Sequence, residues 1–304
     1  MKITEQKFIY GTLWENMVKT TEQALKAGAL VPISTETRYI RDSGVDFCVR
    51  IVSNLQRKLN FSAADPDTWK DRPDPFLPYE EDLFVGDISD THVCLLNKFN
   101  VIDHHVLMVT RAFEDQETLL TRQDFAAACI CLAEFDGLVF YNGGRVAGAS
   151  QPHKHLQMIP LPIADKGPKV PMEALFPSAP PEDHPTRVPG LPFLHAFAGV
   201  RAGLMADPLG AAPVAFTMYR KMLETVGLNV SSMPERSRQS GPYNLLFTRE
   251  WMLLVPRSRE FFGSMSVNAL GFGGALLVSD EEQMRRVEAH GGMSVLRHTA
   301  VVAG

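Results

Sequence analysis

The side chains best suited to chemistry in this chain are two histidines and a glutamine, spaced one residue apart: His153, His155 and Gln157. The alternating run at 155–159 predicts a strand, and side chains two apart on a strand share a face. A segment rich in glycine precedes them and can offer free backbone N–H groups to anionic oxygens. This pattern suits attack by an imidazole nitrogen on a phosphorus atom.

The motif has two other interpretations. Histidines at this spacing could bind a metal ion, but Gln157 is a poor ligand for transition metals and Lys154 adds positive charge. The histidines could also be ordinary hydrogen-bonded core residues. The H-x-H-x-Q pattern follows a loop of small residues at 148–151, here called the small-residue loop, and precedes Pro-Leu-Pro at 160–162. Together they form a longer and more specific pattern than either alternative requires.

Composition limits the class of protein. The chain has 304 residues, of which 45% are hydrophobic, enough for a sizeable core. A net charge of −5 disfavours a general nucleic-acid binder. We expect no membrane span and no secretory signal peptide, because no apolar run is long enough for either. The four cysteines fit no common zinc spacing, which predicts reduced thiols and a cytoplasmic location; they are Cys48, Cys94, Cys129 and Cys131.

Strands and helices in alternation must position the motif. Apolar periodicity predicts helices at 13–29, 122–135, 213–226 and 281–290, the first three ended by Gly28, Gly137 and Gly227. It predicts strands at 47–52, 83–85, 91–97, 106–110, 138–142, 243–247, 251–255 and 273–278. Two stretches rich in proline, 65–78 and 163–192, lack periodicity and predict surface loops.

A weak similarity between two segments of the chain suggests a duplicated sheet. Residues 106–111 resemble 252–257, and a short apolar strand precedes each; chance likeness between two apolar strands is the alternative. We therefore expect an N-terminal half, 1–162, that carries the motif and a proline-rich excursion at 163–192. A C-terminal half, 193–304, is expected to pack on the same sheet system.

The motif and its surroundings resemble the H-x-H-x-Q branch of the histidine-triad (HIT-like) superfamily. This branch contains the galactose-1-phosphate uridylyltransferases and the diadenosine tetraphosphate phosphorylases, also called ATP adenylyltransferases. The phosphorylases are the closer match, since the likeness extends over most of the chain, at 11–14, 50–55, 96–99, 191–195, 243–246 and 251–258. The resemblance implies an α+β, uridylyltransferase-like fold with a mainly antiparallel sheet, flanking helices and an internal pseudo-duplication.

The resemblance also implies a reaction. His155 would attack the α-phosphorus of diadenosine tetraphosphate, and inorganic phosphate would then attack the adenylyl-histidine, so that ATP and ADP form. Gln157 stands where hydrolytic relatives have a third histidine, and it can donate a hydrogen bond in every protonation state. His153 would support their orientation, and no tightly bound cofactor or protein-bound metal is implied, although Mg²⁺ can accompany the nucleotide.

Substrate contacts follow from the same resemblance. They would come from the small-residue loop, from strand ends and from a second glycine-rich run: Gly148, Ala149, Ser150, Gln151, Asn142, Asn97, Lys98, Asn268, Ala269 and Leu270. Arg50 and Lys154 are candidates for polyphosphate contacts. Ser279 stands where the family often has lysine. We expect His104 and His105 to be positional and not catalytic.

Other functions stay open. They are nucleotidyl transfer to a sugar phosphate, hydrolysis that releases AMP, a nucleotide sensor without turnover and a metal-dependent oxidase of the cupin type. Uridylyltransferases often carry zinc ligands, which have no convincing counterpart here, and the intact His155 and Gln157 argue against a sensor. The expected partners are diadenosine tetraphosphate, ATP, ADP and phosphate, with no nucleic acid and no membrane. The oligomeric state is left open.

Overall fold

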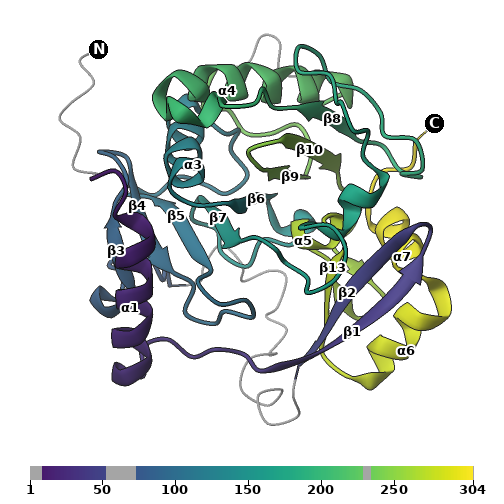
Figure 1. Ribbon diagram of the computed structural model, residues 1–304, viewed down its shortest axis with the longest axis horizontal. Coiled ribbons are helices and arrows are strands. Elements are labelled where there is room, and N and C mark those ends of the chain that lie inside the picture. Colours follow the sequence, from purple (N-terminus) through teal and green to yellow (C-terminus); the bar gives the residue numbers. More distant parts are fainter. Residues whose placement is uncertain (1–8, 53–72, 229–233, 304) are drawn as a thin grey trace.

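One eight-stranded sheet crosses the whole molecule (Figure 1). A computed structural model describes residues 9–52, 73–228 and 234–303. The strand order is β3-β4-β5-β7-β6-β9-β10-β8, and all neighbours pair antiparallel. The first five strands along the chain come from residues 84–160 and the last three from 196–256, so both halves of the chain build the same sheet.

The strands of this sheet are β3 (Phe84–Asp87), β4 (His92–Leu96), β5 (Val106–Thr110), β6 (Gly137–Gly143), β7 (His155–Pro160), β8 (Ala196–Gly199), β9 (Tyr243–Phe247) and β10 (Trp251–Pro256). Every residue of β4, β5, β6, β9 and β10 is buried. A sheet covered on both faces explains why these strands read as continuous apolar runs and not as an alternation.

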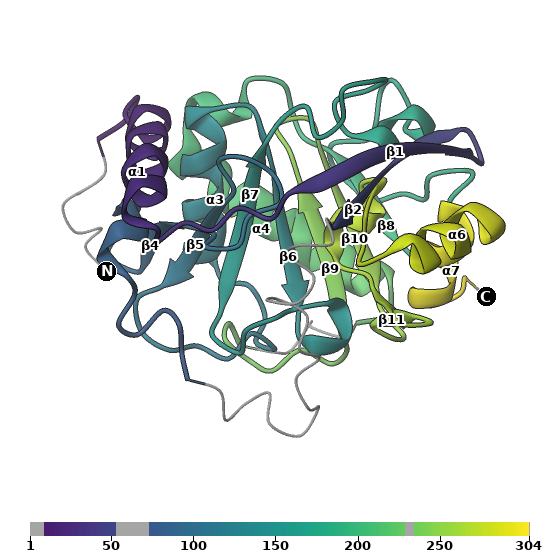
Figure 2. The ribbon, with the colours of Figure 1, turned by 90° about the horizontal axis from the view of Figure 1, so that it is seen from below.

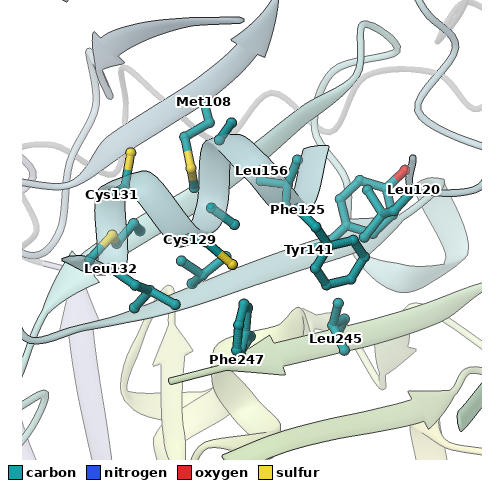
Figure 3. Close-up of a cluster of buried hydrophobic side chains, with 14 of the residues drawn as sticks. Met108, Leu120, Phe125, Cys129, Cys131, Leu132, Tyr141, Leu156, Leu245 and Phe247 are labelled. Carbon is teal, nitrogen blue, oxygen red and sulfur yellow. The ribbon is translucent and has the colours of Figure 1, made fainter. Parts of the chain in front are cut away.

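Three helices cover one face of the sheet: α1 (Leu13–Ala27), α3 (Arg122–Glu134) and α4 (Pro208–Thr225). The α3 helix packs against α4, and both contact strands of the sheet. Figure 3 shows the core beneath α3, where side chains of the helix meet those of the sheet, among them Phe125, Cys129, Leu132, Tyr141, Leu245 and Phe247.

A smaller sheet covers the other face. It has the order β1-β2-β13, formed by β1 (Thr35–Asp42), β2 (Val45–Val52) and β13 (Ala275–Val278), with β2 and β13 parallel. The helices α5 (Ala269–Phe272), α6 (Glu281–His290) and α7 (Gly292–Thr299) accompany it, and the β1–β2 hairpin lies beside α6 and α7 (Figure 2). A second core joins this layer to the central sheet through residues such as Phe47, Phe140 and Leu253.

Short elements complete the chain. They are η2 (Glu81–Leu83), η3 (Arg145–Ala147), η4 (Pro171–Leu175), η5 (Leu204–Ala206), β11 (Phe261–Phe262) and β12 (Met265–Ser266). In the part of the chain that the structure describes, no helix is long and apolar enough to cross a membrane.

Some of the predicted helix ends agree with the structure and others do not. Gly28 ends α1 in the left-handed conformation, at φ 72°, and the helix predicted at 281–290 is α6. The prediction that Gly137 ends α3 was wrong, since that helix ends at an extended Phe135 and Gly137 begins β6. The α4 helix begins at Pro208, ahead of the predicted start at Pro213, which lies inside the helix.

Among the elements that were not predicted are β1, β8, α5 and α7. The strand β1 is largely polar and none of its residues is buried, so its apolar alternation is weak. Of the predicted loop at 65–78, residues 65–72 lie outside the described part of the chain. Residues 163–192 are irregular apart from η4.

The predicted duplication stays a prediction. The strands β5 and β10 lie in one sheet, and each pairs antiparallel with the strand before it. The arginines that follow them differ, because Arg111 pairs with Asp87 near the surface whereas Arg257 is buried and donates to Asn244.

Candidate active site

A cavity of about 810 Å³ lies over the face of β7 that carries His155 and Gln157. Its walls come from β2, β4, β6, β13, the segment at 75–80, the small-residue loop and the start of α5. Of the predicted site residues, those that line it are Arg50, Asn97, Lys98, Asn142, Gly148, Ser150, Gln151, His155, Gln157, Asn268 and Leu270.

His155 has the hydrogen bonding of a neutral nucleophile. Its Nδ1 lies 2.8 Å from the backbone carbonyl oxygen of His153, which can only accept, so Nδ1 carries the proton. Burial lowers the pKa of His155 to about 4, which keeps the ring neutral near pH 7. The other nitrogen, Nε2, therefore has a free lone pair on a residue that lines the cavity.

Gln116 holds the backbone at this point. The pairing of β6 with β7 stops at Phe140 and Gln157. Beyond it, the buried Gln116 side chain accepts from the backbone N–H of His155 at 2.9 Å and donates to the backbone oxygen of Asn142 at 2.9 Å. One side chain thus replaces main-chain pairing between β6 and β7 beside His155. Gln116 was not among the predicted site residues, because it belongs to no motif.

His153 is buried and does not line the cavity. Its Nδ1 lies 2.8 Å from Asp74 Oδ2, and its Nε2 lies 2.8 Å from the backbone oxygen of Thr110. The ring of Phe76 packs edge-on against it. Because both ring nitrogens are engaged, His153 is poorly placed to share a metal ion with His155. The contacts support an orienting role, in which His153 presents its carbonyl to His155.

Two carboxamides beside His155 have their oxygens occupied by the protein. Asn142 Oδ1 accepts from the backbone N–H of Ala269 and from Asn244, both at 2.9 Å. Gln157 Oε1 lies 3.0 Å from His105 Nε2. Among the described residues neither NH₂ group has a partner, and both residues line the cavity. These NH₂ groups are therefore available to donate to a ligand.

The small-residue loop turns at Gly148, whose φ is 88°. A Cβ atom there would lie 2.9 Å from the Cα atom of Asn268 and 2.9 Å from the backbone oxygen of Val267. Glycine therefore lets the loop lie directly against the start of α5. Of the residues that follow, Ser150 and Gln151 line the cavity, whereas Ala149 is buried outside it.

This close approach predicts the effect of Gly148→Ala. We expect it to lower the free energy of unfolding by about 1–3 kcal/mol more than Gly167→Ala does, because overpacking against backbone adds to the conformational strain. Gly167 is the matched control, since its φ is 79° and nothing lies within 4 Å of its added Cβ. Urea unfolding of both variants measures the difference, and equal losses would contradict the packing argument.

The position of Lys154 does not fit the polyphosphate contact that was expected of it. Consecutive strand residues face opposite sides, and the Lys154 ammonium lies on the side away from the cavity, 2.9 Å from Glu114 and 3.3 Å from Asp124. The side chain is fully buried in this ionic network, which ties the motif to α3. We therefore propose no phosphate contact for Lys154.

The remaining predicted residues differ in availability. Arg50 lines the cavity while donating to the backbone oxygen of Ile163 at 2.8 Å, and Lys98 pairs with Glu80 at the rim. Ala269 contributes its backbone N–H to Asn142 and does not line the cavity. Ser279 is absent from the cavity wall and bonds to Asp280.

One part of the cavity is apolar. Phe76, Leu95 and Leu107 form it, with Tyr79 at its edge, and they belong to a separate cluster of buried side chains on this face of the sheet. An apolar slot suits a flat base, and two amide donors beside a neutral histidine suit a phosphorus centre. Fold and site together define a nucleotidyltransferase class of site.

Comparison with known proteins shows the family. Residues 3–178 match the Ap4A phosphorylase N-terminal domain, and residues 189–302 match the ATP adenylyltransferase C-terminal domain. The chain belongs to the Ap4A phosphorylase family of ATP adenylyltransferases. The resemblance inferred from the sequence is thereby confirmed.

The relatives cover between 70% and 97% of the chain. Diadenosine tetraphosphate phosphorylase 2 of Saccharomyces cerevisiae is 26% identical over 291 residues, covering 87% of this chain and 86% of the relative. Protein APA1 of the same yeast is 29% identical over 235 residues, 70% of this chain and 71% of the relative. The crystal structure of yeast Ap4A phosphorylase Apa2 matches with a TM-score of 0.77 and 25% identity, over 97% of this chain and 99% of that one. The predicted fold class is confirmed.

Proposed function

We propose that this chain cleaves diadenosine tetraphosphate by phosphorolysis to ATP and ADP, with His155 as the nucleophile. The observation that carries the proposal is the unprotonated Nε2 of His155 at the cavity, with its Nδ1–H held by the His153 carbonyl. Family membership supports it. So does yeast Apa2, an Ap4A phosphorylase of the same fold that has been solved in complex with Ap4A.

The first step transfers an adenylyl group to the protein. The Nε2 lone pair of His155 attacks the α-phosphorus, the bond from that phosphorus to the bridging oxygen breaks, and ATP leaves. The His153 carbonyl keeps its hydrogen bond to Nδ1–H and stabilises the positive charge that develops on the ring. The NH₂ groups of Gln157 and Asn142 donate to the phosphoryl oxygens as charge builds on them.

The second step returns the adenylyl group to an acceptor. A phosphate oxygen attacks the α-phosphorus, the bond to Nε2 breaks, ADP leaves and His155 is again neutral. Among the described residues, Arg50 and Lys98 are the cations that line the cavity, and their positive charge would attract phosphate. We propose that Mg²⁺, where required, enters with the polyphosphate; among the described residues no group of three or more His, Cys, Asp or Glu gathers to hold a metal ion.

Product analysis tests the proposed reaction. With diadenosine tetraphosphate and phosphate, we expect ATP and ADP in equal amounts. Without phosphate, turnover should stop after the protein is adenylylated. Rapid release of AMP and ATP without phosphate would make the chain a hydrolase. Faster transfer to a hexose 1-phosphate than to phosphate would instead identify a sugar-phosphate transferase.

The pH dependence follows from the lowered pKa of His155. The neutral ring is the nucleophile, so adenylylation should be constant on lowering the pH from 7 and fall only as the pH passes through about 4. Single-turnover rates without phosphate measure this, with circular dichroism at each pH to exclude acid unfolding. A midpoint near the ordinary histidine value of about 6.5 would show that the ring is not desolvated as described.

We also propose a cytoplasmic location. The four cysteines are free and buried, and burial raises the pKa of the Cys94 and Cys129 thiols to about 12. Such thiols suit a reducing compartment. Recovery of the native protein from an oxidising compartment by cell fractionation would contradict this.

A further inference from the structure

The carboxamide of Gln157 has two possible orientations with opposite chemistry. With its NH₂ toward the cavity it donates to a phosphoryl oxygen, whereas with its oxygen toward the cavity it repels one. The two orientations have nearly the same shape, so packing alone cannot distinguish them. Something in the surrounding hydrogen bonds must select one.

The backbone N–H of Phe99 fixes the orientation of the Asn97 side chain. The N–H of Phe99 lies 3.2 Å from Asn97 Oδ1, and a backbone N–H can only donate. The oxygen of Asn97 is therefore turned to Phe99. Its Nδ2 is turned to His105, at 3.1 Å from Nδ1 of that ring.

His105 carries this hydrogen-bond direction from Asn97 to Gln157. An amide NH₂ only donates, so His105 Nδ1 accepts and the single proton of the ring sits on Nε2. That nitrogen lies 3.0 Å from Gln157 Oε1 and donates to it. Burial lowers the pKa of His105 to about 4, which excludes a doubly protonated ring at neutral pH. The Gln157 oxygen is thus occupied, and its NH₂ is left for the cavity.

The hydrogen-bonded series from Asn97 through His105 to Gln157, here called the relay, is held in place by the surrounding strands. Asn97 and His105 lie at the two ends of the β4–β5 connection, and the backbone N–H of Asn97 donates to the backbone oxygen of His105 at 2.9 Å. The His105 ring also packs against Phe140, which lies opposite Gln157 in the β6–β7 pairing. A relay with little freedom to rotate suits a fixed orientation of the amide.

We propose that Asn97 and His105 are positioning residues that hold the NH₂ of Gln157 toward the reacting phosphorus. This inference rests on the proposed function and deepens it. It also gives Asn97 a different role from the direct substrate contact that the family resemblance implied. The direction of the relay can be reversed by one substitution, Asn97→Asp, because a carboxylate accepts from Phe99 and from His105 alike.

Nitrogen NMR of histidine-labelled protein tests the relay without turnover. The His105 signals are assigned by their loss in His105→Gln. At about pH 9, where an ordinary imidazole is neutral, we expect the proton on Nε2 in the unaltered protein and on Nδ1 in Asn97→Asp. A proton on Nδ1 of His105 in the unaltered protein would overturn the inference.

A double-mutant cycle tests the consequence. Asn97→Asp at the same pH should slow adenylylation by about 10²–10³-fold, the usual cost of a lost donor to a developing oxyanion. If Asn97 acts through Gln157, the same substitution in a Gln157→Ala background should change the rate by less than about threefold. Losses that multiply in the double variant would contradict a shared pathway.

His104→Asn is the matched control and should leave the rate unchanged. His104 neighbours the relay residue but contacts Thr21 and Trp14, and its φ of 58° is one that asparagine tolerates. A rate loss in this control equal to that of Asn97→Asp would show a general disturbance of the β4–β5 connection and overturn the inference. Absence of phosphorolysis in the unaltered protein would refute the proposed function, while the NMR result would still decide the relay.

Discussion

His155→Ala should abolish turnover of diadenosine tetraphosphate, lowering kcat on the order of 10⁴-fold or more. The substitution removes the Nε2 that forms the proposed covalent bond to phosphorus. Among the described residues the only other histidine that lines the cavity is His105, whose two ring nitrogens are both engaged. Steady-state formation of ATP and ADP measures the loss.

The folded state must survive for that result to count. The backbone N–H of His155 keeps its bond to Gln116 in the variant, so circular dichroism and thermal unfolding should show an intact fold. His184→Ala is the matched control, since His184 is exposed, pairs with Asp183 and lies outside the cavity wall, and it should keep full activity. Near-normal phosphorolysis by a folded His155→Ala protein would remove His155 from its role.

Gln157→Ala should slow the reaction by about 10²–10³-fold, or roughly 2.7–4 kcal/mol of transition-state stabilisation, because it removes a donor to the phosphoryl oxygens. Gln157→His should lose less. A neutral imidazole can fill a similar hydrogen-bonding position, but it titrates near neutral pH and can exchange protons with an acceptor. We expect slower phosphorolysis and a larger share of AMP released by water.

The ratio of ADP to AMP from each variant, at fixed phosphate, measures that partition, with burst kinetics for adenylylation. An unchanged rate and an unchanged ratio in Gln157→Ala would make Gln157 only a strand residue beside the site. The relay from Asn97 through His105 would then have no function in the reaction.

The parts of the site that were predictable are local in sequence. The motif at 153–157 follows a small-residue loop directly, and a strand repeats every second side chain on one face. His153, His155 and Gln157 were therefore expected on one face. His155 and Gln157 do line the cavity, whereas His153 comes before β7 and is buried outside the cavity. The same rule, applied to Lys154, would have placed its ammonium on the opposite side, in the ionic network with Asp124.

The unpredicted parts depend on contacts between distant segments. Gln116 reaches His155 across 39 positions, and His105 reaches Gln157 across 52. No periodicity or motif in the sequence predicts such hydrogen bonds, because they arise from the order of strands in the sheet. The pair of adjacent histidines offered one signal, since His105 comes directly before β5, which pairs with β7.

Element boundaries failed for a related reason. Apolar periodicity predicted a helix at 213–226, yet the helix begins at Pro208, after an Asp207 cap whose side chain accepts from the backbone N–H of Gly210. The strand β1 shows no apolar alternation, and its partner β2 and the covering layer hold it in place. Tertiary contacts decide both cases.

The central claim is that His155 forms the covalent intermediate, and trapping it is the most direct test. The unaltered protein is incubated with diadenosine tetraphosphate in the absence of phosphate, quenched, digested and analysed by peptide mass spectrometry. The account predicts one adenylyl group on the peptide that contains His155, one ATP released per adenylylated chain, and discharge as ADP when phosphate is added. Adenylylation at another residue, or turnover with phosphate while His155 is never modified, would contradict the account.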